Sequence, residues 1–256
     1  MSGALAGRRV LITRPREQAQ ALERLVRDAG GAPVCVPAIE IRELDDLAPF
    51  HAVADRLASF DLAIFISRNA VRRALDLLGG KLWPAGLKVA TVGQGSRAEL
   101  EQRGFTDVIA PAGAPARSDS EALLALPKFG ALRGSRIVIF RGEGGRELLG
   151  QELAARGASV EHAVCYRRVV PEGEGMRSAW AGGMDAITVS SAEGLANLLA
   201  MLGEGAARRL SGIPLFVPHP RVAVEAQRRG LPQAIVAGPG DAEMVAALVA
   251  HFGAAR

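Results

Sequence analysis

The sequence has few of the residues that mark disulfide-rich, metal-binding or nucleic-acid-binding proteins. Its only cysteines, Cys35 and Cys165, each sit in or beside an apolar segment, which predicts two buried free thiols rather than a disulfide framework. The four histidines have no spacing from one another or from the cysteines that suits a metal ion, so no metal site is expected. Aromatic residues make up only 4% of the chain, and without stacking rings beside the basic residues no nucleic-acid partner is expected.

Long apolar runs and blocks of like charge are also missing. No stretch approaches the roughly 18 apolar residues that span a bilayer, and the first residues do not read as a secretory leader. We therefore expect a cytoplasmic protein with no membrane partner. The net charge of +4 and the pI of 9.7 would suit an anionic partner, but no window holds five or more like charges.

What the sequence does contain is a repeat. The segment that begins at residue 9 returns at residue 136 with the same pattern of an apolar strand, an arginine and a closing glycine. Arg14 and Arg141 are 127 residues apart, and so are Gly30 and Gly157. A repeated unit of this length predicts two similar halves of the molecule.

A second repeated pair follows at a similar offset. Asp61 and Asp185 are 124 residues apart, and so are Ser67 and Ser191. In each copy the aspartate precedes an apolar strand-like run and the serine follows it. Two similar halves usually face each other across a cleft, so the functional site is expected there.

Apolar strands and amphipathic helices alternate along the chain. The predicted strands are residues 10–13, 32–36, 62–66, 89–92, 108–110, 137–140, 160–165, 186–189, 215–217 and 234–236. The predicted helices are residues 16–28, 69–78, 96–103, 121–126, 146–156, 193–202, 222–229 and 242–252, with a loop over 111–116 and Ser118 or Asp119 as the cap before residue 121. Strands that are apolar on both faces indicate parallel sheets covered on both sides, and hence a doubly wound α/β fold.

Ligands of such folds bind beyond the carboxyl ends of the strands. The turns at these ends share small hydroxyl residues, glycines and occasional arginines, and N–H groups at helix N-termini bind carboxylates. Ordinary helix capping explains any single turn, but recurrence in six turns favours a ligand with several acidic groups. The predicted binding residues are Arg14, Ser67, Asn69, Gly93, Gly95, Ser96, Arg141, Gly142, Ser190, Ser191, His219 and Arg221. For Arg14 and Arg141, packing at the strand ends is an equal alternative.

Two further features concern cofactors and catalysis. Residues 93–98 fit the G-x-G-x-x-A dinucleotide fingerprint, but the first strand–helix turn lacks it and no acidic residue follows about 20 residues on, so no nicotinamide or flavin cofactor is expected. Tyr166 is the only tyrosine and ends a predicted strand. Its phenol can donate a proton to a leaving group, or it can simply pack at an interface.

Together these motifs resemble the uroporphyrinogen-III synthase family. The matching segments are Val10-Leu11-Ile12-Thr13-Arg14-Pro15, Phe65-Ile66-Ser67-Arg68-Asn69-Ala70-Val71, Val92-Gly93-Gln94-Gly95-Ser96, Arg141-Gly142-Glu143-Gly144-Gly145-Arg146 and Val164-Cys165-Tyr166-Arg167. The chain departs from the family after residue 217, where Arg221 replaces the last threonine of a turn; an arginine side chain can still bind a carboxylate.

The resemblance implies two flavodoxin-like domains, each a doubly wound parallel sheet. The first would be discontinuous, residues 1–38 with 170–256, and the second, residues 42–166, would be inserted into it. Residues 37–41 and 166–170 would form a two-stranded hinge, which places Tyr166 at the cleft between the domains.

The resemblance also implies an activity. The family closes hydroxymethylbilane, a linear tetrapyrrole rich in carboxylates, to uroporphyrinogen III with inversion of ring D and loss of water, as a cyclising lyase of haem biosynthesis. No cofactor is implied, and we expect a monomer. Tyr166 would donate the proton to the leaving hydroxyl, and the turn residues would hold carboxylates. The alternatives are a non-catalytic two-domain small-anion-binding protein and, third, a dinucleotide-dependent enzyme.

Overall fold

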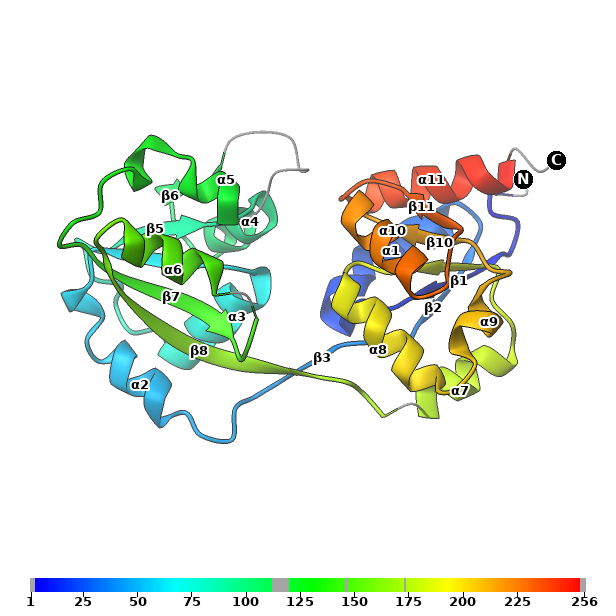
Figure 1. Ribbon diagram of the computed structural model, residues 1–256, viewed down its shortest axis with the longest axis horizontal. Coiled ribbons are helices and arrows are strands. Elements are labelled where there is room, and N and C mark those ends of the chain that lie inside the picture. The colour runs from blue at the N-terminus through cyan, green and yellow to red at the C-terminus, as the bar shows by residue number, and fades with distance from the viewer. Residues whose placement is uncertain (1–2, 112–119, 146, 173, 254–256) are drawn as a thin grey trace. The chain divides into compact units, whose positions relative to one another are not determined.

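A computed structural model describes residues 3–111, 120–145, 147–172 and 174–253. The chain divides into two compact units, the first formed by Met1–Glu40 with Val169–Arg256 and the second by Ile41–Arg168. Each unit holds one sheet, with helices packed on both of its faces (Figure 1). This arrangement confirms the predicted α/β class.

The sheet of the first unit has parallel strands in the order β2, β1, β9, β10, β11. Its strands are β1 (Arg9–Ile12), β2 (Ala32–Cys35), β9 (Ala186–Thr188), β10 (Leu215–Val217) and β11 (Ala234–Val236). Strand β1 therefore lies between its neighbour in sequence, β2, and the distant β9.

Helices bury both faces of this first sheet. They are α1 (Arg16–Asp28), α7 (Glu174–Ala181), α8 (Ala192–Leu202), α9 (Ala206–Leu210), α10 (Pro220–Arg228) and α11 (Asp241–Gly253). Val10 and Ile12 pack with α1 and α11, whereas Leu11 packs with α8 and α10. This alternation of one strand between two cores explains why its sequence is continuously apolar.

The sheet of the second unit has the order β3, β8, β7, β4, β5, β6, and its strands from β8 to β6 pair in parallel. Its strands are β3 (Glu40–Arg42), β4 (Leu62–Phe65), β5 (Lys88–Thr91), β6 (Val108–Ile109), β7 (Arg136–Gly142) and β8 (Ser159–Val169). Apart from β3 the order repeats that of the first unit, with β7 in the place of β1 and β4 in the place of β9.

Two cores also cover the second sheet. Its helices are α2 (Ala48–Ala54), α3 (Arg68–Leu78), α4 (Gln94–Gln102), α5 (Ser120–Leu124) and α6 (Leu148–Ala155), with 3-10 turns at Leu57–Ser59 and Pro127–Phe129. Phe65 and Phe140, whose rings stack at 4.7 Å between centroids, pack with α2, α3 and α4. Ile64 and Ile139 face the other way, toward α5 and α6.

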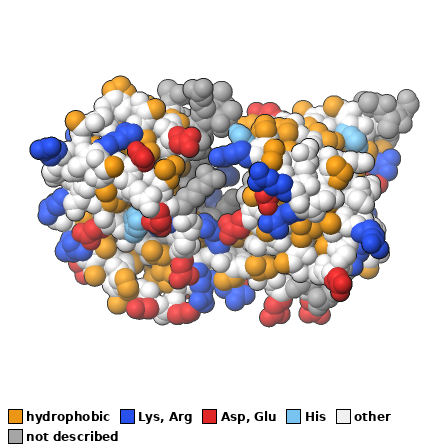
Figure 2. Space-filling model, in the orientation of Figure 1, with side chains coloured by type: hydrophobic (Ala, Val, Ile, Leu, Met, Phe, Trp, Pro, Cys, Tyr) orange, Lys and Arg blue, Asp and Glu red, His pale blue; other side chains and the backbone are white. Residues whose placement is uncertain are grey.

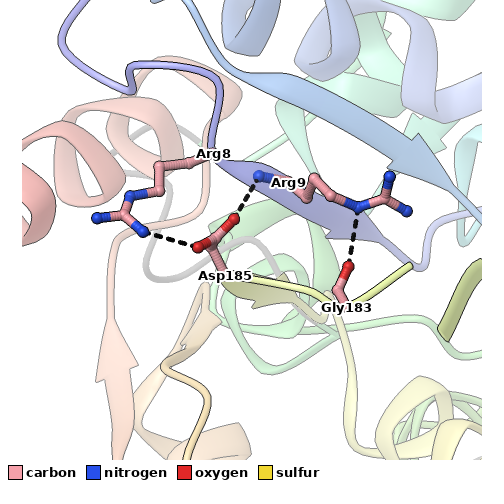
Figure 3. A network of polar contacts seen from close by, with 4 residues as sticks. All are labelled: Arg8, Arg9, Gly183 and Asp185. Atoms are coloured by element: carbon pink, nitrogen blue, oxygen red, sulfur yellow. Dashed lines mark hydrogen bonds and ion pairs between the residues drawn. The ribbon is translucent and has the colours of Figure 1, made fainter. Parts of the chain in front are cut away.

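The repeated aspartates join the central strands at their amino ends. Asp185 Oδ2 accepts a hydrogen bond of 2.8 Å from the Arg9 backbone N–H, and Asp61 Oδ2 accepts one of 2.7 Å from the Arg136 backbone N–H. In the first unit the Arg8 guanidinium also donates to Asp185 at 2.8 Å (Figure 3). Burial alone would raise the pKa of Asp185, but these hydrogen bonds outweigh it and leave that pKa below its ordinary value.

The repeated glycines end equivalent helices in a conformation that other residues avoid. Gly30 has a φ of 85° and Gly157 a φ of 92°. A Cβ atom would lie 2.7 Å from Gly3 Cα in the first case and 3.1 Å from Arg133 Cα in the second. Both the backbone angle and the close approach therefore require glycine.

On the face seen in Figure 2, basic and acidic side chains are interspersed in each unit. Ion pairs join oppositely charged side chains within each unit, such as Arg56 with Glu161 and Arg229 with Glu225. No helix in the described part of the chain combines the length and the hydropathy that a membrane-spanning segment needs.

The structure adds elements to the predicted ones and extends one predicted strand. Helices α2, α7 and α9 had no counterpart among them, and strand β3 was expected only as part of the hinge segment 37–41 that the resemblance implies. The strand predicted over 160–165 continues to Val169 as β8, through residues that the resemblance assigns to the second hinge strand, 166–170. Its pairing with β7 has an irregularity at Arg141 and Gly142. The predicted caps Ser118 and Asp119, most of the loop over 111–116 and the first residue of the helix 146–156 lie outside the described residues.

Candidate functional site

Ser67 begins helix α3 at the carboxyl end of β4. Its backbone is extended, and its Oγ accepts a hydrogen bond of 3.0 Å from the Ala70 N–H. This is the N-cap geometry, which satisfies one of the free N–H groups of the first turn and stabilises the helix by about 1 kcal/mol. The remaining N–H groups of that turn carry the positive end of the helix dipole.

The Ser67 hydroxyl also contacts Tyr166, which is 99 residues away in sequence. The two hydroxyl oxygens are 3.1 Å apart. Tyr166 is only 2% exposed, and its backbone oxygen accepts a hydrogen bond of 2.7 Å from the Glu143 N–H. The tyrosine is therefore fixed by strand pairing at its backbone and by Ser67 at its tip.

Gly142 makes room for the tyrosine ring. It lies opposite Tyr166 in the pairing of β7 with β8, and a Cβ atom there would lie 2.6 Å from two ring carbons. Gly142 was predicted to bind a carboxylate through its N–H group; in the structure it is buried and serves the packing of Tyr166.

The hydroxyl pair has one proton to offer a third group. Ser67 Oγ already accepts from Ala70, and one of the two hydroxyls donates to the other, which leaves a single O–H unused. Because Tyr166 is buried and Ser67 is partly exposed, the geometry favours Tyr166 as donor to Ser67 and Ser67 as the outward donor.

Helix α4 begins beside α3, because β5 pairs with β4. Its N-cap, Gly93, is extended and has no side chain to cap the first turn. Gly95 is exposed, whereas Ser96 is buried. The predicted residues Gly93, Gly95 and Ser96 thus lie in one helix start at the same sheet edge as Ser67.

Arg68 is a residue that sequence reasoning missed. Its Cδ and Nε atoms lie 3.4 Å from the position a Cβ atom would take on Gly95, so its side chain reaches from the start of α3 to the start of α4. A cation in the first turn opposes the helix dipole, and this mismatch was the available signal of an anion-binding turn. Asn69 follows it and is partly exposed.

The first unit has two equivalent helix starts at the carboxyl edge of its sheet. Ser191 caps α8 by accepting a hydrogen bond of 3.0 Å from the Gly194 N–H, as Ser67 does in its repeat. His219 caps α10, its Nδ1 accepting from the Arg221 N–H at 3.1 Å. Ser190 is partly exposed and Arg221 is exposed.

Arg14 and Arg141 both pack at strand ends. Arg14 is 8% exposed and forms an ion pair with Asp241, the first residue of α11. Arg141 is 4% exposed and forms an ion pair of 2.9 Å with Glu147. Packing at the strand ends accounts for these contacts, and substrate binding by Arg14 and Arg141 stays a prediction.

Neither cysteine is poised for chemistry. Both are free thiols, Cys165 buried and Cys35, against expectation, partly exposed. Burial raises the pKa of Cys165 to about 12 and that of Cys35 to about 11, which keeps both protonated and unreactive near neutral pH. Among the described residues, no group of three or more His, Cys, Asp or Glu side chains is arranged to hold a metal ion.

Solved structures of the same fold are known. The chain aligns with uroporphyrinogen III synthase of Thermus thermophilus at a TM-score of 0.64 and 19% identity, over 97% of this chain and 100% of that one. With the enzyme of Helicobacter pylori the TM-score is 0.61 and the identity 15%, over 95% and 99%. At these identities the likeness establishes the fold alone.

Sequence comparison goes further. The family model described as uroporphyrinogen-III synthase HemD matches residues 20–246. The chain is 36% identical over 203 residues to the uroporphyrinogen-III synthase of Salmonella typhimurium, covering 75% of this chain and 79% of the relative. The Escherichia coli protein of the same name is 31% identical over 201 residues, with the same coverage. The chain therefore belongs to the uroporphyrinogen-III synthase family.

Proposed function

We propose that the chain converts hydroxymethylbilane to uroporphyrinogen III, closing the ring with inversion of ring D and loss of water. Membership of a family of cyclising lyases supports the reaction. We place the reaction near Ser67 and Tyr166 because their hydroxyl groups are in contact beside the starts of α3 and α4. We propose further that the enzyme is monomeric and cytoplasmic, and that it needs no cofactor.

Carboxylates of the substrate bind at the helix starts. In this proposal N–H groups at the starts of α3, α4 and α8 bind them, and His219 and Arg221 offer side chains at the start of α10. The residues concerned are Ser67, Asn69, Gly93, Gly95, Ser96, Ser190, Ser191, His219 and Arg221, to which the structure adds Arg68.

Departure of the ring A hydroxyl requires a proton. Ser67 donates it, Tyr166 passes its own proton to Ser67, and the hydroxyl leaves as water from a now cationic azafulvene. Ring D attacks through its substituted carbon, and the spiro intermediate breaks and rejoins at the other position. The proton lost on closure returns by the same two hydroxyls, so the overall change is loss of one water.

Positioning contributes more than acid assistance. The uncatalysed closure gives the uninverted isomer, so the protein must hold the bilane in the pose from which ring D attacks through its substituted carbon. Fixing reacting groups in this way is worth up to roughly 7–11 kcal/mol, whereas general acid help is worth about 10²–10⁴-fold in rate.

The domain layout is part of the same proposal. Two flavodoxin-like domains, residues 1–38 with 170–256 and residues 42–166, are joined by hinge segments 37–41 and 166–170. Two observations support it. The chain passes between the compact units twice, next to Glu40 and Val169. The first sheet has the strand order of flavodoxin, and the second sheet without β3 has the same spatial arrangement with a permuted chain order, β7 standing in the place of the first strand.

The test of the reaction supplies hydroxymethylbilane, oxidises the product and separates the porphyrin isomers. We expect the porphyrin with ring D inverted, isomer III, in excess over a protein-free blank, which gives the uninverted isomer I. Isomer I alone, as in the blank, would contradict the proposal; binding of the bilane without conversion would favour the non-catalytic anion-binding protein.

The hydroxyl pair is tested by Tyr166→Phe. This variant keeps the ring and the Ser67 cap but removes the proton relay, so we expect kcat for isomer III to fall by about 10²-fold with little change in KM. Ser67→Thr keeps the hydroxyl and should retain more activity than Ser67→Ala. Unchanged turnover of Tyr166→Phe would remove the relay from the mechanism.

A further inference from the structure

The second unit has a cavity at the end of its sheet opposite to Ser67. Its volume is about 310 Å³, and it lies at the amino ends of β4, β5 and β7. Leu62, Phe129 and Ile137 give it apolar walls, and Lys88, Lys128 and Ser135 add polar groups. This volume is in the range of small-molecule sites.

The corresponding place in the first unit is filled. Arg8 and Asp185 occupy the repeat positions of Ser135 and Asp61. The Arg8 guanidinium forms an ion pair of 2.8 Å with Asp185 (Figure 3), and it lies 5.1 Å from the centre of the Phe252 ring. Ser135 has only a hydroxymethyl group at that position, so the second sheet lacks a counterpart of the Arg8 side chain there.

The helix that packs on this face of the sheet is also smaller in the second unit than in the first. Helix α11, which follows the last strand of the first sheet, runs for 13 residues and carries Phe252 at its end. Its counterpart after β6 is α5, with only five residues, followed by the 3-10 turn that contains Lys128 and Phe129. Among the described residues, the helix on this face of the second sheet is therefore the shorter one.

The cavity also gathers most of the lysine in the protein. The chain has three lysines, and two of them, Lys88 and Lys128, line this cavity. Both are exposed, and neither forms an ion pair with a described residue, whereas Lys81 pairs with Asp55 at 2.7 Å. The strand registers place Pro214 of the first unit at the position of Lys88, so this cation is specific to the second unit.

We infer that this cavity binds a small amphipathic carboxylate, with its apolar body against Leu62, Phe129 and Ile137 and its carboxylate at Lys88 and Lys128. Asp61 also lines the cavity, but its Oδ2 is engaged by the Arg136 N–H. The two ammonium groups leave a net positive charge beside the apolar walls, which selects an anion with an apolar body over either an inorganic anion or a neutral hydrocarbon.

The test is calorimetric titration of the full chain with 2-naphthoate, with 2-naphthamide as the neutral ligand of the same shape. We expect saturable binding of one naphthoate and at least tenfold weaker binding of the amide. Lys88→Gln and Lys128→Gln should each weaken naphthoate binding about fivefold. Lys81→Gln, the third lysine, is the matched control and should bind as the unchanged chain does.

A second variant copies the first unit. Ser135→Arg places the Arg8 side chain at the equivalent position, and we expect it to abolish naphthoate binding while the thermal midpoint shows a folded protein. Failure of naphthoate to bind the unchanged chain at millimolar concentration would overturn the inference. So would equal binding to the Lys88→Gln, Lys128→Gln double variant, a result that does not depend on the folding of Ser135→Arg.

Discussion

Gly142 approaches the ring of Tyr166 so closely that no side chain fits there. In Gly142→Ala the ring must shift, which would separate its hydroxyl from Ser67 and add packing strain of about 1–3 kcal/mol. We expect the rate of isomer III formation to fall nearly as far as in Tyr166→Phe, and the thermal midpoint to fall as well. Both quantities are measured on the same preparation.

The matched control for this residue is Gly86→Ala. Nothing lies within 4 Å of a Cβ atom at Gly86, and its φ is not positive, so alanine there should change neither rate nor stability by much. If Gly142→Ala were as active as Gly86→Ala, the hydroxyl contact would not matter for turnover.

At the scale of the residue, local contacts were predictable and distant ones were not. Ser67 and Ser191 cap their helices through bonds to residues three positions on, which sequence patterns capture. The contact of Ser67 with Tyr166 spans 99 residues, and that of Arg14 with Asp241 spans 227. Only the packing of the sheets brings such groups together, so the role of Arg14 stayed open in the sequence.

At the scale of the element, the glycine that ends α6 combines two constraints that can be separated. Gly157 has both a positive φ and a close approach to Arg133, whereas Gly104, after α4, has a φ of 91° with no atom within 4 Å. Gly104→Ala should therefore cost about 1 kcal/mol from backbone strain alone, and Gly157→Ala clearly more. Urea denaturation of the two variants measures the difference; equal losses would show that Arg133 yields without cost.

Helix and strand positions were predictable where the apolar residues form a clear helical period or a run with sharp ends. Helix α1 and strands β10 and β11 have the predicted bounds, since amphipathic spacing or a bounded apolar run defines each. Helices α2 and α9 have only seven and five residues, too few for a period to stand out. Strand β8 continues past residue 165, where the apolar run ends, because it pairs with β7 and with the distant β3.

At the scale of the whole molecule, each compact unit combines copies from both repeats. Strand β1 pairs with β9, and β7 pairs with β4, so the first copy of one repeat lies beside the second copy of the other. The sequence reveals the repeats, but their order along the chain would equally suit two tandem halves. Only the resemblance to a known family led us to expect an interleaved arrangement.

This arrangement predicts that Ile41–Arg168 folds when expressed alone. Both hydrophobic clusters of this unit consist only of residues within that range, and neither draws on the rest of the chain. A chain of this size can bury enough surface to be stable.

We expect a single cooperative urea transition for the isolated segment Ile41–Arg168 and no formation of isomer III from hydroxymethylbilane. A segment that stops at residue 158 lacks β8, exposes the edge of β7 and should not unfold cooperatively. A gradual, non-cooperative transition of Ile41–Arg168 itself would mean that the first unit is needed for the second to fold.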